Sequence, residues 1–171
     1  DAVINDYQQY VQTTYGRTPI VFVRGLGARL WDSEGKEYLD WVSGGRAGNA
    51  LGHCHPAVTA ALKQQLETLT FVSNDFYNPW GAKLGKLLAE RSGGRKSFFC
   101  NSGAEASETA IKLARKWGLG KRGAGCHEVI SMERSFHGRT LGALSATAQT
   151  KFHHGFQPIV PGFKYVPWDD L

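Results

Sequence analysis

The chain has 171 residues, of which 42% are hydrophobic and 20% charged, and its formal net charge is +5. These values are typical of a globular protein with one domain, or one domain and part of another. No apolar run approaches the roughly 18 residues that a membrane helix needs, and no basic helix face carries interleaved aromatic residues, so the sequence argues against a membrane span and against nucleic-acid binding.

The first elements that the sequence predicts are three short strands. Residues 20–23, 28–31 and 37–41 each alternate in the way that strands do. Between the last two, Asp32-Ser-Glu-Gly35 has the composition of a turn, because its glycine tolerates a positive φ. We therefore expect a small β-meander, followed by a glycine-rich link over residues 43–48.

Two helices are predicted after this link. The first begins at Pro56 and the second at Asn78-Pro79, since proline is tolerated in the first turn of a helix and asparagine is a common N-cap. Gly93-Gly94 ends the second helix. Both carry an apolar stripe that we expect to face inward, namely Val58, Leu62, Leu66 and Leu69 in the first and Leu84, Leu87 and Leu88 in the second.

The second half of the chain predicts an α/β fold. Residues 97–100 have the pattern of a strand, 102–117 of a helix and 128–132 of a second strand, which together have the length of one βαβ unit with a parallel sheet. A helix over 140–148 and a strand over 164–167 follow. The inward side of the helix over 102–117 is expected to consist of Ala110, Ile111, Leu113, Ala114 and Trp117. So few parallel strands leave exposed edges, which indicates an α/β fold cut off part-way.

The turn into the helix at 102–117 is the most informative feature. Ser102-Gly-Ala-Glu105 has the capping-box pattern, and a helix start offers unpaired N–H groups and the positive end of the helix dipole. Gly103 and Ala104 have minimal side chains, so an anion could approach the backbone closely, and Ser102 could add a hydroxyl bond. The sequence predicts either an anion-binding cup at residues 101–104, called the phosphate cup below, or simply a well-capped helix.

A second glycine-rich segment suggests a competing function, the binding of a dinucleotide. Residues 118–123 match the dinucleotide fingerprint G-x-G-x-x-G. That fingerprint works only between a strand and the start of a helix. Here it follows a helix and leads towards a strand, so we expect a helix end and a flexible loop.

The loop after the strand at 128–132 carries Ser135-Phe-His-Gly-Arg-Thr140. If both strands of the βαβ unit are parallel, this loop lies beside the phosphate cup, at the carboxyl edge of the sheet. Phe136 could stack on a flat ring, and the planar fork of Arg139 suits a carboxylate. Taken singly, each residue fits a structural role better than a functional one. Together, beside an anion-binding turn, they describe a site for a phosphorylated ring and a carboxylate-bearing substrate.

The histidines and cysteines predict neither a metal site nor a disulfide framework. In His53-Cys54-His55 adjacent side chains rarely converge on one ion, so these are expected to be loop residues, and His153-His154 is expected to be solvated. The three cysteines are odd in number and far apart, which fits a reducing compartment. We expect a soluble intracellular protein of the cytoplasm or the mitochondrial matrix.

Six segments, spread over essentially the whole chain, carry a resemblance to a known family. They are Gly16-Arg-Thr-Pro-Ile-Val21, Leu30-Trp-Asp-Ser-Glu-Gly-Lys-Glu-Tyr-Leu-Asp40, Asn49-Ala-Leu-Gly-His-Cys-His-Pro56, Asn101-Ser-Gly-Ala-Glu-Ala106, Ser135-Phe-His-Gly-Arg-Thr-Leu-Gly-Ala143 and Phe156-Gln-Pro-Ile-Val-Pro-Gly162. Together they resemble the class III aminotransferases, which use pyridoxal 5′-phosphate (PLP), and within this family the acetylornithine branch.

The resemblance implies the type I PLP-dependent aminotransferase fold: a three-layer α/β/α sheet, incomplete in this chain, preceded by a small α+β segment. Residues 1–75 would be the N-terminal segment of the small domain, with the β-meander and a linking helix, and residues 76–171 the first part of the large PLP-binding domain. The implied reaction moves an amino group from N-acetylornithine to 2-oxoglutarate in arginine biosynthesis. The implied assembly is a homodimer of the full-length protein.

The resemblance also implies roles for individual residues. The cofactor-binding residues would be Ser102, Gly103, Ala104, Phe136 and His137. The first three would bind the phosphate, and Phe136 would stack on the pyridine ring. Arg139 would bind the α-carboxylate of the amino-acid substrate.

Two departures from the family bear on function. Residues 43–49 contain one extra residue, which places Arg46 near the expected substrate approach. The lysine that forms the Schiff base with PLP is expected beyond Leu171, and Lys112, Lys151 and the other lysines do not match its position, so the chain alone should be inactive. Two other readings stay open: a non-catalytic aminotransferase-like subunit of a larger structural assembly, and a nucleotide-binding module that uses residues 118–123.

Overall fold

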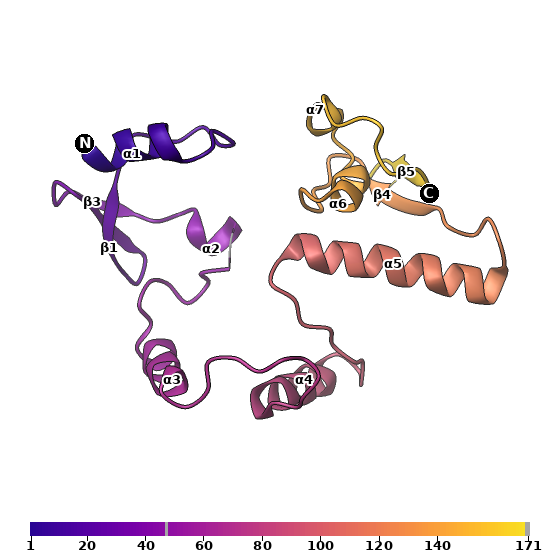
Figure 1. The fold of residues 1–171 in the computed structure, drawn as a ribbon, viewed down its shortest axis with the longest axis horizontal. Coiled ribbons are helices and arrows are strands. Elements are labelled where there is room, and N and C mark those ends of the chain that lie inside the picture. The colour runs from indigo at the N-terminus through magenta and orange to yellow at the C-terminus, as the bar shows by residue number, and fades with distance from the viewer. Residues whose placement is uncertain (47, 170–171) are drawn as a thin grey trace. The chain divides into compact units, whose positions relative to one another are not determined.

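The computed structural model describes residues 1–46 and 48–169, without the side chains at positions 45 and 46. The side chain of Arg46, which the sequence sets apart, therefore lies outside the described residues. The chain divides into two compact units, Asp1–Asn78 and Pro79–Leu171 (Figure 1). Among the described residues, no helix is both long and apolar enough to cross a bilayer.

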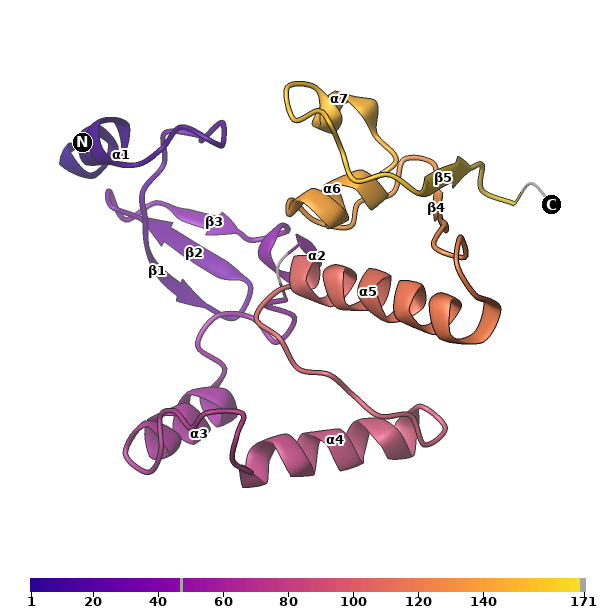
Figure 2. The same cartoon turned by 45° about the vertical axis from the view of Figure 1, so that its right-hand side comes forward.

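The first unit is built on a three-stranded antiparallel sheet of order β1-β2-β3 (Figure 2). Its strands are β1 (Phe22–Leu26), β2 (Arg29–Asp32) and β3 (Glu37–Leu39). Each strand pairs with the next along the chain, which confirms the predicted β-meander.

The turn between β2 and β3 is organised by the side chain of Asp32. Its Oδ1 accepts hydrogen bonds from the backbone N–H groups of Glu34 at 3.0 Å and Lys36 at 2.8 Å. Its Oδ2 accepts one from the hydroxyl of Tyr38 at 2.8 Å. Gly35 takes a φ of 84°, so the predicted turn is confirmed with the glycine in its expected conformation.

Two helices of this unit were not predicted, and an aspartate side chain bonds backbone N–H groups at the start of each. α1 (Ala2–Tyr10) follows Asp1, whose side chain accepts a hydrogen bond from the N–H of Val3 at 2.9 Å. α2 (Ser43–Arg46) lies within the glycine-rich link, and Oδ1 of Asp40 accepts from the backbone N–H groups at positions 42 and 43. These bonds fix the chain at the entry to α2, whose glycines have poor helix propensity.

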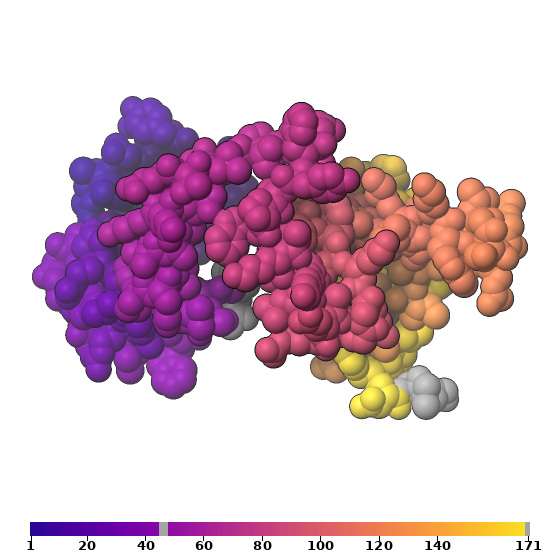
Figure 3. Space-filling model, turned by 90° about the horizontal axis from the view of Figure 1, so that it is seen from below, coloured from indigo at the N-terminus to yellow at the C-terminus, as the bar shows by residue number. Residues whose placement is uncertain are grey.

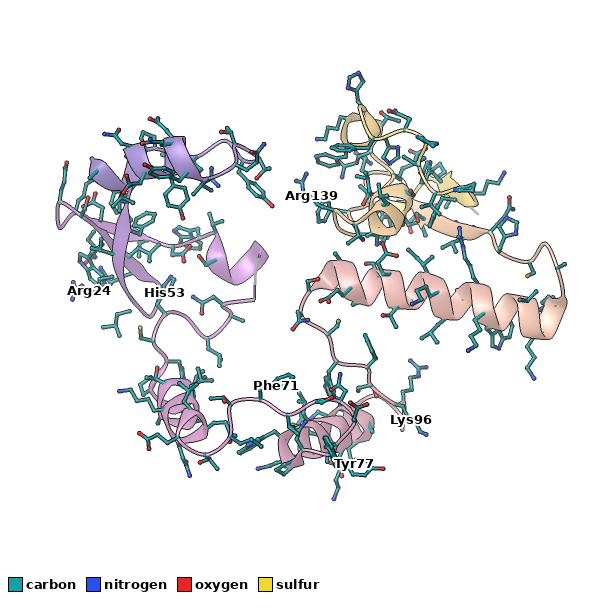
Figure 4. All side chains as sticks on the ribbon, viewed as in Figure 1. Arg24, His53, Phe71, Tyr77, Lys96 and Arg139 are labelled. Atoms are coloured by element: carbon teal, nitrogen blue, oxygen red, sulfur yellow. The ribbon has the colours of Figure 1, made fainter. Side chains whose placement is uncertain are left out.

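His53 anchors the loop that follows α2. Its Nε2 lies 2.7 Å from Oδ2 of Asp40, and its Nδ1 lies 3.2 Å from the side-chain nitrogen of Asn49. A Cβ at Gly25 of β1 would come within 2.7 Å of the imidazole, so the ring rests on the backbone of that strand (Figure 4). This confirms the prediction that His53 is a loop residue.

Two helices begin at the prolines that the sequence singled out: α3 (Pro56–Leu66) in the first unit and α4 (Pro79–Arg91) in the second. Their apolar stripes, however, do not face inward, since Leu62 is 58% exposed and Leu88 is 40% exposed. In the part of the chain that the structure describes, neither helix packs extensively on another element of its unit. In Figure 3, atoms of both helices lie exposed on the face in view. A stripe is buried only where a partner covers it.

The second unit holds α5 (Gly103–Arg122), β4 (Val129–Met132), α6 (Leu141–Ala146), α7 (Thr150–His153) and β5 (Phe163–Val166). β4 and β5 pair in parallel. The sheet is therefore parallel as predicted, but the two strands are not the pair from which the sequence predicted it. The predicted helix over 140–148 forms as the shorter α6.

Residues 97–100 do not form the predicted strand. This segment has no regular structure, and among the described residues β4 pairs with β5 alone. An extended apolar segment becomes a strand only by sharing its hydrogen bonds with a neighbour. The parallel crossover therefore runs from β4 through α6 and α7 to β5, not from residues 97–100 through α5.

α5 continues past the predicted end at residue 117, through the glycine-rich segment. A Cβ at Gly118 would collide with the carbonyl oxygen of Cys126, because the chain beyond the helix folds back onto this glycine. Gly123, with a φ of 88°, ends the helix. Of the loop expected at 118–123, residues 118–122 are thus the end of the helix, which cannot serve as a dinucleotide-binding turn.

The buried core of the second unit gathers on α6. It consists of Ile111, Ala143, Leu144 and Ala146, with the polar residues Ser131, Ser145, Thr147 and His153. Of the residues of α5 that were expected to face inward, only Ile111 is buried; Leu113 and Trp117 are 61% and 60% exposed. The expectation failed because one stripe of α5 contacts the rest of its unit.

His153 was expected to be solvated, and this is wrong. Its side chain is buried, and its Nε2 lies 3.0 Å from the carbonyl oxygen of Leu144 and 2.7 Å from that of Thr147. The imidazole N–H thus donates to carbonyl oxygens at the end of α6, which also accept backbone N–H bonds from Thr147 and Gln149. His154 is exposed, as expected.

Candidate functional site

The phosphate cup is formed by the capping box at the start of α5. Oγ of Ser102 accepts a hydrogen bond from the backbone N–H of Glu105 at 3.2 Å. In return, Oε2 of Glu105 accepts from the backbone N–H of Asn101 at 2.8 Å and from the Ser102 hydroxyl at 3.2 Å. The hydroxyl proton of Ser102 is therefore directed to Glu105 within this structure.

The backbone N–H groups of Gly103 and Ala104 take no part in the hydrogen bonds of this capping box. They have no acceptor among the described residues. A Cβ at Gly103 would have no atom within 4 Å, so the backbone at this end of α5 is open to a ligand. Two free donors at the positive end of a long helix suit a phosphate group.

Glu105 is ionised at neutral pH, because the hydrogen bonds from Asn101 hold the pKa of its carboxyl below the usual value.

Its lowered pKa gives a prediction for Glu105→Gln. The native carboxylate stabilises the fold above its unfolded pKa of about 4.5, and this contribution is lost as the pH falls through the lower folded value. The difference in unfolding free energy between the wild type and Glu105→Gln, measured by urea denaturation from about pH 7 to about pH 3, should therefore be constant at first and shrink on acidification. A difference that grows in acid would contradict the assigned hydrogen bonds.

The loop that carries Phe136 and Arg139 packs on this same end of α5. Gly138 is buried, and a Cβ there would lie 2.7 Å from Cβ of Ala104. The backbone N–H of His137 donates to Oγ1 of Thr147 at 2.9 Å, which ties the loop to the end of α6. The structure thus brings the loop and the phosphate cup together as predicted, although a glycine contact does so and not two neighbouring strand ends.

Phe136 and Arg139 belong to an exposed aromatic cluster. Phe136 is 56% exposed and meets Phe152 edge to face, with ring centroids 6.1 Å apart. The guanidinium carbon of Arg139 lies 5.7 Å from the Phe136 ring centroid and 5.1 Å from that of Phe152 (Figure 4). Such cation–π contacts orient a guanidinium while its N–H groups can still face a carboxylate.

Sequence reasoning missed two residues of this region. Phe152, on α7, supports both Phe136 and Arg139. Glu108, on α5, accepts hydrogen bonds from Thr140 and Ala143 at the start of α6. Glu108 could have been noticed because it follows Ala104 by four residues and so lies on the same helix face.

Within the described part of the chain, no three His, Cys, Asp or Glu side chains gather as metal ligands. Cys54, Cys100 and Cys126 are exposed free thiols. The groups that the site offers to a ligand are backbone N–H donors, aromatic rings and a guanidinium.

Comparison with known proteins gives a consistent result. The family model described as aminotransferase class III matches residues 10–171. The acetylornithine aminotransferase of Caldanaerobacter subterraneus subsp. tengcongensis is 52% identical over 164 residues, which cover 96% of this chain and 42% of the relative. That of Aquifex aeolicus is 53% identical over 163 residues, covering 95% of this chain and 43% of the relative.

Solved structures are similar over the same extent. The ornithine aminotransferase of Toxoplasma gondii superposes with a TM-score of 0.90 at 36% identity, covering 98% of this chain and 40% of that one. An (S)-enantioselective omega-transaminase of Thermomicrobium roseum gives 0.85 at 33% identity, covering 97% and 39%. The chain thus spans about two fifths of the length of the proteins it matches, and its fold is an N-terminal part of the type I aminotransferase fold.

Proposed function

The chain belongs to the class III aminotransferase family, and on this premise we propose that it is the N-terminal part of an enzyme that moves an amino group from N-acetylornithine to 2-oxoglutarate in arginine biosynthesis. Members of this family depend on PLP. The observation that carries the proposal is the pair of unpaired amides at Gly103 and Ala104, beside Phe136 and Arg139. The choice of N-acetylornithine is supported by the names of relatives about half identical to the chain.

The residues of the site fit this cofactor and substrate. The amides of Gly103 and Ala104, with Ser102 beside them, would hold the phosphate, and the exposed ring of Phe136 would pack on the pyridine, with His137 next to it in the same loop. When bound, PLP supplies an electron-withdrawing ring that stabilises charge at the carbon bearing the amino group. Arg139 would bind the α-carboxylate of the amino-acid substrate as a planar fork.

The proposal assigns no catalytic lysine to residues 1–171. Lys112 lies on the exposed surface of α5, and the ammonium of Lys151 lies 4.9 Å from the ring centroid of Phe152. We place the catalytic lysine in the remainder of the full-length protein, which would form a homodimer. Residues 1–171 alone would then be inactive.

The test is to express the complete reading frame and residues 1–171 separately. With N-acetylornithine and 2-oxoglutarate, the complete protein should bind PLP and form glutamate, and the shorter chain should form none. Ornithine as the amino donor tests the substrate assignment. If the complete protein prefers ornithine, then ornithine and not N-acetylornithine is the substrate. A complete protein that neither binds PLP nor forms glutamate would favour the non-catalytic assembly subunit.

A further inference from the structure

One stripe of α5 makes the contacts of this helix with the rest of the second unit. The stripe consists of Ala104, Glu108, Ile111, Arg115 and Gly118, all of them buried or half-buried. Their spacing of three and four residues places them on a single helix face. Ala104 contacts Gly138, Ile111 is in the core, and Arg115 donates to the carbonyl oxygen of Pro161 at 2.6 Å.

Glu108 is the one acidic residue in this stripe, and it caps another helix. Its Oε1 accepts a hydrogen bond from Oγ1 of Thr140 at 2.5 Å and from the backbone N–H of Ala143 at 3.1 Å. Thr140 occupies the N-cap position of α6, yet its side chain makes no capping bond of its own. The carboxylate from α5 takes over that function, at the end of α6 where negative charge is favoured.

The backbone of α6 is shaped to admit this carboxylate. A Cβ at Gly142 would lie 2.5 Å from Oε2 and 2.7 Å from Oε1 of Glu108. Only a residue without a side chain allows the carboxylate to lie so close to the helix. Gly138 and Gly142 thus meet Ala104 and Glu108, one helical turn apart on α5.

From these contacts we infer that Glu108 is a positioning residue, which fixes the Phe136–Arg139 loop relative to the phosphate cup. α6 begins two residues after Arg139, and its cap at Thr140 is bonded to the same helix that provides the cup. If this bond is lost, the loop remains attached by Gly138 and His137 but Arg139 is no longer held at a fixed distance from Gly103. The expected effect of Glu108 on substrate binding rests on the proposed function, whereas its expected effect on the loop does not.

The test uses Glu108→Gln in the full-length protein, with Glu90→Gln as the matched control. Glu90 is on α4, is 58% exposed and pairs only distantly with Lys86, at 3.9 Å. In the protein without cofactor, Glu108→Gln should speed amide hydrogen exchange over residues 136–140 about tenfold, while Glu90→Gln should not. In the loaded enzyme it should raise KM for the amino donor about tenfold and change kcat less, because Arg139 binds ground state and transition state alike.

Thr140 provides the second arm if Glu108→Gln fails to fold. Thr140→Val removes the hydroxyl that donates to Glu108 and should reproduce the faster exchange, whereas Thr140→Ser keeps it and should behave as wild type. In combination, Glu108→Gln and Thr140→Val should be clearly less than additive, since the first weakens and the second removes the same hydrogen bond.

The outcomes separate the two proposals. Faster exchange over 136–140 supports the positioning role even if the full-length protein transfers no amino group, in which case only the proposed function fails. Unchanged exchange, or an equal effect of Thr140→Val and Thr140→Ser, overturns the positioning role. So does a lower melting temperature with unchanged KM, because a merely structural residue would give that result.

Discussion

Replacing Arg139 by alanine in the full-length protein is expected to lower kcat/KM for N-acetylornithine by about 10²- to 10³-fold, the effect of losing one partner of a hydrogen-bonded charge pair. The guanidinium lies over the rings of Phe136 and Phe152, which orient it. Arg139→Lys keeps the charge but loses the planar fork, so we expect a loss of about tenfold. Steady-state kinetics with varied amino donor measure both effects.

Two comparisons make this result specific. Arg91→Ala removes an exposed arginine at the end of α4 and should leave the kinetics unchanged. An amino donor of similar length that lacks the α-carboxylate should be used poorly by the wild type and equally poorly by Arg139→Ala. If Arg139→Ala instead lowers the rate with both donors by the same factor, Arg139 does not bind the carboxylate.

The parts of the fold that sequence predicts well are those whose cause is local. The turn at Asp32 and Gly35 and the cap at Ser102 depend on side chains that bond their own neighbours, and all three residues behave as predicted. The helix starts at Pro56 and Pro79 are local as well, because proline is favoured at the first helical position.

The failures have a common physical reason, which is that a partner decides the outcome. Residues 97–100 lack a neighbouring strand, and the leucines of α3 and α4 lack a covering element among the described residues. His153 looks solvated in the sequence because nothing near it in the chain indicates that its imidazole will meet the carbonyl oxygens at the end of α6. Glu108 was missed likewise, since the two groups that donate to its carboxylate lie more than thirty residues away in the chain.

The candidate site depends both on local sequence motifs and on a contact between distant segments. Its residues were identified from motifs at 101–106 and 135–143, but the contact that joins the motifs could not be derived from spacing. That contact is the approach of Gly138 to Ala104, and it requires a backbone conformation that only glycine adopts readily, with a φ of 132°. Gly138 is therefore the position at which the geometry of the site is most sensitive to a single methyl group.

Gly138→Ala is accordingly expected to destabilise the full-length protein by about 2–5 kcal/mol, as backbone strain and overpacking add. The new Cβ would lie 2.7 Å from Cβ and 2.8 Å from Cα of Ala104, and 3.1 Å from Cβ of Ala143. Because these neighbours belong to the first turn of α5 and to α6, relief of the clash must move the loop away from the phosphate cup. PLP affinity, measured by equilibrium dialysis, should fall together with the free energy of unfolding measured in urea.

Gly155→Ala separates the strain from the clash. Gly155 also has a positive φ, of 85°, but a Cβ there would have no atom within 4 Å. Its substitution should cost only the strain, about 1 kcal/mol, and should leave PLP affinity unchanged. Adding Ala104→Gly to Gly138→Ala removes one of the two closest atoms and should restore part of both losses. If Gly138→Ala proves no worse than Gly155→Ala, the close packing of the loop on α5 does not set the geometry of the site.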